Sequence, residues 1–494
     1  MKDINDLGLL VDSNVPLIII ESHEEKRVLA TVSRLASKRN IPCYSWTVTE
    51  GLKQIRIGFN FDKTPVDKEP DEVLASIKSN NQTALYVLND FHPYLENEPR
   101  RIRMLKDIAL DYKEIRQTVI FLSYRFSMPP DIKPFSAFFE MSLPSREQIV
   151  RLIKDEVAHW STKNSGLKVQ SDKLTIGKLI DSLQGVSLPE AKRLIRSAII
   201  DDGAITKSDL PELNKTKFKL MDMDGVLTYE YEMANMNEVG GLRTLKGWLY
   251  KRREVLHGNN PSGLDNPKGI LLLGVQGGGK SMAAKAVASH WHLPLLRLDF
   301  GSLYNKYYGE TERNLRESLK IADTMAPCVL WMDEIEKGIS AGLDDQGVSK
   351  RLLSTLLTWM AEREKMVFVA ATANDVRKLP PELIRKGRLD EIFFVDLPDQ
   401  EVRKEIFTIH LQKRGLGHKL YDVENLAEVS EGFSGAEIEQ AIVAALYSIA
   451  GNGTELTSAN IMEEINNTSP LSVVMAEDIA GLRVWASGRA VAAN

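Results

Sequence analysis

One eight-residue stretch constrains this chain more than any other: Gly274-Val275-Gln276-Gly277-Gly278-Gly279-Lys280-Ser281. It matches the pattern G-x-x-x-x-G-K-[ST] at every fixed position. Its glycines let backbone N–H groups crowd around phosphate oxygens in conformations that a Cβ would forbid. Lys280 supplies a positive charge for the phosphates, and Ser281 supplies a hydroxyl for Mg²⁺. The stretch therefore predicts a phosphate-binding loop.

Both flanks of this loop support the prediction. Residues 269–273 form a short apolar run of the kind found in a buried parallel strand. Residues 282–288 are rich in helix-forming side chains. The loop is then expected between a strand and a helix N-terminus, where the helix dipole favours a bound anion. A glycine-rich turn that matches by chance is the alternative.

Composition limits the class of protein. The chain has 494 residues, of which 43% are hydrophobic and 27% charged, so it is long enough for several globular domains. Its net charge of −5 does not favour nucleic acid or an anionic membrane. Two distant cysteines, an acidic N-terminus and no apolar run of about 20 residues favour a cytoplasmic protein.

Residues 1–200 alternate between two kinds of segment. Short apolar runs predict strands at 16–20, 41–46, 84–88 and 118–122. Helical patterns cover 24–39, 100–112 and 145–160, and Ser145 with Gln148 forms a capping-box pattern at the start of the last. Such alternation predicts a parallel sheet with helices on its faces.

Residues 201–236 are polar and rich in turn residues, which is typical of a linker. Asp222 and Asp224 lie here in a D-x-D-G sequence that resembles part of a calcium loop. A calcium loop requires a glutamate at its twelfth position, and Met233 stands there. We therefore do not expect a metal site in this segment.

The second half of the chain repeats the alternation around the phosphate loop. Strands are expected at 295–298, 328–332, 366–371 and 392–395, and helices at 310–324 and 349–364. This pattern predicts a large α/β domain over 237–399. A small helical lid is expected over 400–470, and a tail over 471–494 that docks as a helix.

Polar side chains follow the strands of this domain. Asp333 and Glu334 come directly after the run 328–332, where an aspartate can hold Mg²⁺ through water and a glutamate can activate the attacking water. Asn374 follows the next strand and is placed to touch a γ-phosphate. Arg385 and Arg388 lie beyond it and can stabilise charge on a transferring phosphoryl group. Ordinary surface charges are the alternative for the acidic pair and for the arginines.

Together these residues resemble the AAA family of ATPases. The resemblance covers about 237–470. It assigns the family's Walker A motif to 274–281, Walker B to Asp333 and Glu334, sensor 1 to Asn374, and two arginine fingers to Arg385 and Arg388. Val239 and Gly240 resemble the segment beside adenine, and 432–437 resembles the lid segment near sensor 2. The implied nucleotide contacts are Val239, Gly240, Gly274, Val275, Gln276, Gly277, Gly278, Gly279, Lys280, Ser281, Met282, Gly435 and Ala436.

The resemblance implies more than a nucleotide site. It implies a three-layer αβα P-loop module with a small helical lid, ATP and Mg²⁺ as ligands, and a homo-hexameric ring in which arginines complete the neighbouring site. Tyr307 and Tyr308, in the stretch 306–312, resemble the pore loop with which the family grips a polypeptide. Two core tyrosines before a helix are the alternative.

The N-terminal third is predicted to repeat the second half. Residues 85–90 parallel 329–334, with Asn89 in place of Asp333 and Asp90 in place of Glu334. Residues 119–124 parallel the strand before Asn374. The loop 21–27 has no glycine, and its three acids would repel phosphate. We infer a degenerate AAA-like α/β domain over 1–200, with an unrelated α/β domain as the alternative.

The sequence thus predicts an ATP-hydrolysing AAA protein that assembles into a ring and remodels or regulates a protein partner. The layout and the tail are similar to AAA proteins of cyanobacteria and algal plastids, which implies a stromal location if the chain is plastid-encoded. A slow nucleotide-dependent switch or scaffold without threading is the second hypothesis. A nucleic-acid motor is disfavoured by the acidic balance and the lack of a basic, aromatic-interleaved patch. Neither nucleic acid nor a membrane is an expected partner.

Overall fold

The computed structural model describes residues 2–55, 68–164, 167–200, 203–206, 208–221, 226–231, 234–256, 264–303, 310–340, 346–385, 387–417, 420–450 and 455–494. These residues form two compact units. The first contains 1–144 with 187–189, and the second contains 145–186 with 190–494.

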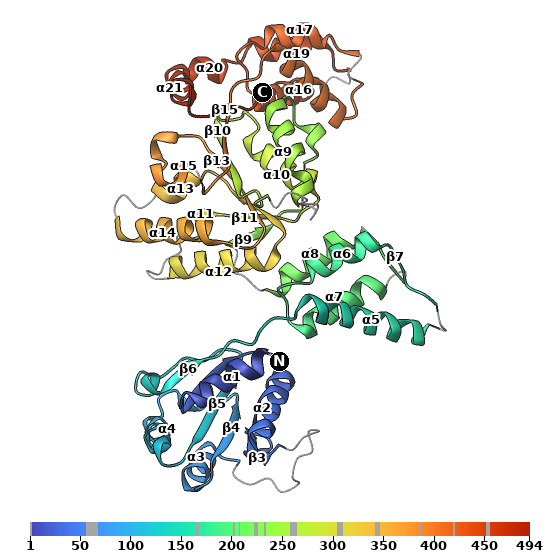
Figure 1. Cartoon of the computed structure of the whole chain (residues 1–494). Helices are drawn as coiled ribbons and strands as arrows, with labels where there is room; N and C mark the ends of the chain where they lie inside the picture. Colours follow the sequence, from blue (N-terminus) through green and yellow to red (C-terminus); the bar gives the residue numbers. More distant parts are fainter. Residues whose placement is uncertain are drawn as a thin grey trace. The chain divides into compact units, whose positions relative to one another are not determined.

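The first unit contains a sheet with strand order β3-β2-β4-β5-β1-β6 (Figure 1). All neighbouring strands are parallel except β2 and β3. The strands are β1 (Leu17–Glu21), β2 (Cys43–Thr47), β3 (Gly51–Gln54), β4 (Ala84–Asn89), β5 (Gln117–Ser123) and β6 (Ser136–Phe138).

Helices cover both faces of this sheet. Buried side chains of α1 (Lys2–Asp12) and α2 (Glu25–Arg39) pack in one core, and those of α3 (Pro70–Ser79) and α4 (Pro99–Leu110) pack in another. The helix predicted over 24–39 is confirmed as α2, whose apolar residues recur at helical spacing and are buried. This unit is therefore a three-layer α/β domain.

The chain segment that connects the two sheets in sequence is mainly helical. It contains α5 (Arg146–Lys163), α6 (Lys173–Ser182), α7 (Leu188–Ile200) and α8 (Asp209–Leu220), with the short pair β7 (Gln170–Ser171) and β8 (Ala204–Ile205). The capping box of Ser145 and Gln148 is confirmed at the start of α5. Leu213 and Lys217 of α8 are buried, so the stretch 201–236 contains packed structure where the sequence predicts a linker.

The second sheet has the order β15-β14-β10-β13-β12-β11-β9. Only β9 runs antiparallel to its neighbour. The strands are β9 (Leu227–Tyr229), β10 (Gly269–Gly274), β11 (Leu295–Leu298), β12 (Cys328–Met332), β13 (Val367–Ala373), β14 (Glu391–Val395) and β15 (Val491–Ala492). The helices are α9 (Arg243–Leu256), α10 (Lys280–Trp291), α11 (Phe300–Leu303), α12 (Glu310–Met325), α13 (Ile335–Ser340), α14 (Gln346–Glu362) and α15 (Pro381–Ile384).

This domain, which we call the P-loop domain (226–399), is also layered. Side chains of α9 and α10 pack on one face of the sheet, and those of α12 and α14 pack on the other. The lid consists of α16 (Gln400–Lys413), α17 (Val423–Val429), α18 (Gly435–Ile449) and α19 (Ser458–Asn466), around a core of its own.

The tail is helical and docked, as the sequence predicts, and the structure shows that it docks on the P-loop domain. It contains α20 (Leu471–Val474) and α21 (Ala476–Ala486), and Leu482 and Trp485 pack against the core. It then supplies β15, which pairs in parallel with β14. The sequence does not predict this added strand.

The two sheets share one topology. Numbered along the chain, the parallel strands of the first sheet (β1, β2, β4, β5, β6) follow the order 5-1-4-3-2. Those of the second sheet (β10 to β14) follow the same order. The repeat predicted from the sequence is therefore present in the fold. In neither unit does a described helix have the length and apolar character needed to cross a membrane.

Candidate functional site

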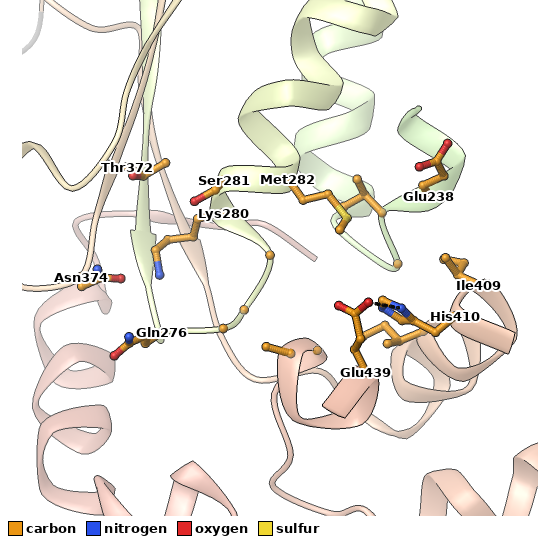
Figure 2. Close-up of a pocket in the computed structure, with 18 of the residues that line it drawn as sticks. Glu238, Gln276, Lys280, Ser281, Met282, Thr372, Asn374, Ile409, His410 and Glu439 are labelled. Atoms are coloured by element: carbon orange, nitrogen blue, oxygen red, sulfur yellow. Dashed lines mark ion pairs between the residues drawn. The ribbon is translucent and has the colours of Figure 1, made fainter. Parts of the chain in front are cut away.

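A cavity of about 290 Å³ lies where the P-loop, the carboxyl ends of β12 and β13, and the lid meet (Figure 2). Parallel α/β sheets bind ligands at this edge, because loops and helix N-termini converge there. The lining residues are Glu238, Val239, Gly240, Gln276, Gly277, Gly278, Gly279, Lys280, Ser281, Met282, Asp333, Glu334, Thr372, Asn374, Ile406, Ile409, His410, Gly435, Ala436 and Glu439.

The loop before α10 depends on glycine. Gly277 has a φ of 75° and Gly279 a φ of 90°, in the region that side chains rarely adopt. A Cβ at Gly277 would also lie 2.8 Å from Ser434 Oγ of the lid. The backbone N–H of Ala436 donates to the Gly277 carbonyl at 3.2 Å. The lid thus closes directly onto the loop.

Lys280 is the first residue of α10 and is buried. Its Nζ donates to the carbonyl oxygens of Gly274 (2.9 Å) and Val275 (2.7 Å). Burial lowers its pKa to about 8, since desolvation disfavours the charged form. The carboxylates of Glu336, Asp333 and Glu334 oppose this shift only in part. A bound phosphate would supply the anion that this cation lacks.

Three oxygen-bearing side chains meet beside Lys280. Ser281 Oγ donates to Asp333 Oδ1 at 3.1 Å, and Thr372 Oγ1 donates to the same oxygen at 2.6 Å. Mg²⁺ prefers oxygen ligands such as carboxylates and hydroxyls. At nucleotide sites it is held by one or two protein side chains together with the phosphates. Ser281 and Asp333 therefore fit a magnesium ion bound together with a nucleotide.

Glu334 is held in an unusual conformation. Its φ is 48°, and its backbone N–H donates to Thr372 Oγ1 at 2.9 Å. Asn374 Nδ2 donates to Glu334 Oε1 at 2.9 Å, which orients one carboxylate oxygen. The Asn374 backbone N–H in turn donates to the buried carboxylate of Glu336 at 2.9 Å, and burial raises the pKa of Glu336. Asn374 and Glu334 therefore form one fixed unit.

The other end of the cavity is largely apolar. Met282, from α10, and Ile409, from α16, point into it (Figure 2). His410 Nδ1 lies 3.4 Å from Glu439 Oε1 of α18, and burial lowers the pKa of His410. An apolar slot with a few polar groups suits a planar base. The cavity thus offers a phosphate end and a base end.

Comparisons with known proteins agree with this geometry. The model of the ATPase family associated with various cellular activities (AAA) matches residues 270–397. Models of the SpoVK-like AAA ATPase N-terminal domain and second domain match residues 3–141 and 147–224. These matches place AAA-type segments on both sheets and on the helices between them.

Two relatives are similar to this chain over nearly its whole length. The chain is 35% identical over 495 residues to a protein of Trieres chinensis named uncharacterized AAA domain-containing protein ycf46, covering 99% of this chain and 97% of the relative. The chain belongs to the AAA ATPase family. The ycf46 protein of Pyropia yezoensis is also 35% identical, over 99% of both chains. A proteasome-activating nucleotidase of Saccharolobus solfataricus is 29% identical over 67% of this chain and 94% of its own length.

The structure separates the predicted site residues into four groups. Val239, Gly240, most of the P-loop, the Walker B pair, Asn374, Gly435 and Ala436 line the cavity. Gly274 and Val275 reach it only through the carbonyls that hold Lys280. Arg385 and Arg388 do not line it. Tyr307, Tyr308 and the acidic pair Asp222 and Asp224 lie outside the described residues.

Arg385 is exposed and lines a different cavity, together with Trp485 and Arg489 of the tail. The guanidinium of Arg388 donates to the Glu382 carbonyl. Neither arginine therefore belongs to the site of its own chain. Their role toward another subunit stays a prediction.

Six further residues line the cavity that the sequence does not single out. They are Glu238, Thr372, Ile406, Ile409, His410 and Glu439. Thr372 could have been predicted from the sequence. It lies two residues before Asn374 at the end of a strand, so the two side chains point to the same side. The lid residues have no such signal in the sequence, because they reach the site only after α16 and α18 pack against the P-loop.

Proposed function

We propose that this AAA protein binds ATP with Mg²⁺ in the cavity, hydrolyses it, and uses the cycle to remodel or regulate a protein partner as a ring. The observation that carries the hydrolytic part is the unit formed by Glu334 and Asn374, beside Lys280 and the Ser281–Asp333 pair. A site that only held nucleotide would not need an oriented carboxylate at the phosphate end.

The residues have distinct roles in this proposal. The P-loop N–H groups and Lys280 bind the β- and γ-phosphates. Ser281 and Asp333 hold Mg²⁺, which would neutralise charge on the phosphates. Glu334 accepts a proton from the attacking water, and the hydrogen bond from Asn374 keeps the Glu334 carboxylate oriented. The apolar slot with His410 excludes water from the base.

The ring is the finer part of the proposal. Arg385 and Arg388 do not line their own site, and an arginine supplied by a neighbouring subunit is one way to stabilise phosphoryl-transfer charge. The similarity to a proteasome-activating nucleotidase supports a nucleotidase that acts on another protein. We propose a homo-hexamer with both arginines acting in trans.

Glu334→Gln tests the hydrolytic assignment. It keeps the side chain's shape and removes its basicity, so ATP should bind within about twofold of the parent while turnover falls by about 100-fold or more. Asp90→Asn is the matched control, because Asp90 holds the equivalent place in the N-terminal sheet with a φ of 49°. Parental turnover by Glu334→Gln would refute the assignment.

Tyr307→Ala separates threading from a switch. A protein that threads polypeptide should lose substrate unfolding while it retains basal ATP hydrolysis, because the aromatic anchor contacts the substrate and not the nucleotide. A fluorescent substrate protein with an unstructured tail reports the loss. Unchanged remodelling would instead support the nucleotide-dependent switch or scaffold.

A further inference from the structure

A row of alternating charges leads away from Asp333. Lys285 of α10 lies 3.2 Å from Glu230, Glu230 lies 3.9 Å from Arg297 of β11, and Arg297 lies 3.9 Å from Asp333 Oδ2. The indole of Trp331 lies beneath the row, with Arg297 4.9 Å and Lys285 5.4 Å from the ring centroid. The candidate metal ligand is therefore one end of a charge network.

The added strand β9 builds this network. It pairs antiparallel with β11, so that Tyr229 lies opposite Leu296. The next residue, Glu230, donates its backbone N–H to the Leu295 carbonyl at 3.0 Å. This places the Glu230 carboxylate between Lys285 and Arg297. Strand β9 thus brings the first residues of the P-loop domain to the edge of the nucleotide site.

Arg297 acts on Asp333 through charge and not through orientation. Asp333 Oδ1 is already fixed by hydroxyl bonds of 2.6 and 3.1 Å. The Arg297 guanidinium lies beyond hydrogen-bond distance of Oδ2, and Arg297 Nε has no hydrogen-bond partner in the described part of the chain. The side chain is 40% exposed, so solvent weakens its field without removing it.

We propose that Arg297 lowers the affinity of the Asp333 site for Mg²⁺, and that Glu230 limits this effect by neutralising Arg297 and Lys285. The inference rests on the proposed nucleotide site and adds to it the residues that set its metal requirement. A cation near Asp333 offsets the carboxylate's negative charge and repels a second cation. The network sets the Mg²⁺ concentration at which nucleotide is held.

This assignment predicts opposite effects for two substitutions. Arg297→Gln removes the repelling charge and should lower the half-saturating Mg²⁺ concentration by about threefold. Glu230→Gln leaves two cations unneutralised and should raise it by a similar factor. Arg297→Lys keeps the charge and should stay near the parent value. A residue that only supported the fold would shift all three variants in one direction.

The experiment measures binding and not turnover. A fluorescent ADP analogue is titrated into the full chain at a series of free Mg²⁺ concentrations and in excess EDTA. The free Mg²⁺ concentration at half-saturation reports the affinity of the site for the metal. The affinity for the ADP analogue in excess EDTA reports whether the nucleotide site is intact. We expect the midpoint to move as stated while the affinity in EDTA stays within about twofold of the parent.

Several results of these titrations would overturn the inference. Equal shifts for Arg297→Gln and Arg297→Lys, shifts of one sign for Arg297→Gln and Glu230→Gln, or unmoved midpoints would overturn the inference alone. A parent protein that binds no nucleotide, with or without Mg²⁺, would overturn the proposed function and this inference with it.

Discussion

The helix that follows β1 in the N-terminal sheet and the helix that follows β10 in the P-loop domain begin at different distances from their strands. In the N-terminal sheet, Glu21 pairs with the last residue of β5, and α2 begins four residues later at Glu25. In the P-loop domain, Leu273 pairs with the last residue of β13, and α10 begins seven residues later at Lys280. Three residues are thus missing where a phosphate loop would wrap. The Glu21 carboxylate instead accepts a hydrogen bond from the Phe126 N–H.

The ends of strands β4 and β12 show which features of the P-loop domain the N-terminal sheet shares and which it lacks. Asp90 and Glu334 follow β4 and β12 with φ angles of 49° and 48°, so the backbone conformation is shared. Asn89 stands where the P-loop domain has Asp333, and its Nδ2 donates to Ser45 Oγ and to the Trp46 carbonyl. A neutral amide lacks the negative charge with which a carboxylate binds Mg²⁺.

The comparison teaches where fold and chemistry reside. Both sheets bury apolar strands between helices and keep one strand order. The chemistry that we propose depends on a few loop residues that contribute little to either core. We therefore interpret the N-terminal sheet as a scaffold that has the fold of an ATPase domain without its phosphate site.

The largest effect within this comparison is expected at the equivalent positions Asn374 and Tyr124. Asn374→Ala removes the hydrogen bond that orients Glu334 Oε1, while Lys337 Nζ stays 2.6 Å from Oε2, and it should reduce ATP turnover by about 10- to 100-fold with little change in ATP affinity. Tyr124→Ala should change neither quantity, since Tyr124 is exposed and stacks on His23. Steady-state hydrolysis and a binding titration check both. Equal losses in the two variants would break the comparison.

A smaller effect follows from the pKa of Lys280, which is about 8 in the free protein. Phosphate binds the protonated lysine and raises its pKa, so nucleotide affinity should fall above pH 8 by up to about tenfold per pH unit. Titrations of ADP between pH 7 and 9.5 measure this slope. Adenosine, which has no phosphate, should show no such slope, and a flat ADP profile would contradict the assignment.

Local signals account for most of what the sequence predicts. The P-loop, the Walker B pair and Asn374 each follow an apolar run, and their residue types match the chemistry at that place. The helical face of α2 follows from spacing alone. The repeat is also visible, because the strands before Asn89 and Asp333 have the same apolar pattern.

What the sequence does not predict depends on distant partners. Strands β9 and β15 span three and two residues, too few for a periodic pattern, and only pairing with β11 and β14 defines them. Helix α8 lies in a polar stretch and is fixed by packing, including the contacts of buried Lys217 with three backbone carbonyls. His410 and Glu439 enter the site only through the lid.

The central claim is that two similar domains provide one nucleotide site. Equilibrium dialysis of labelled ATP against the Glu334→Gln protein with Mg²⁺ measures the number of sites directly. The account predicts one ATP per chain at saturation, and none after Lys280→Met is added. Two ATP molecules per chain, or one that survives Lys280→Met, would show that the N-terminal sheet binds nucleotide and would contradict the account.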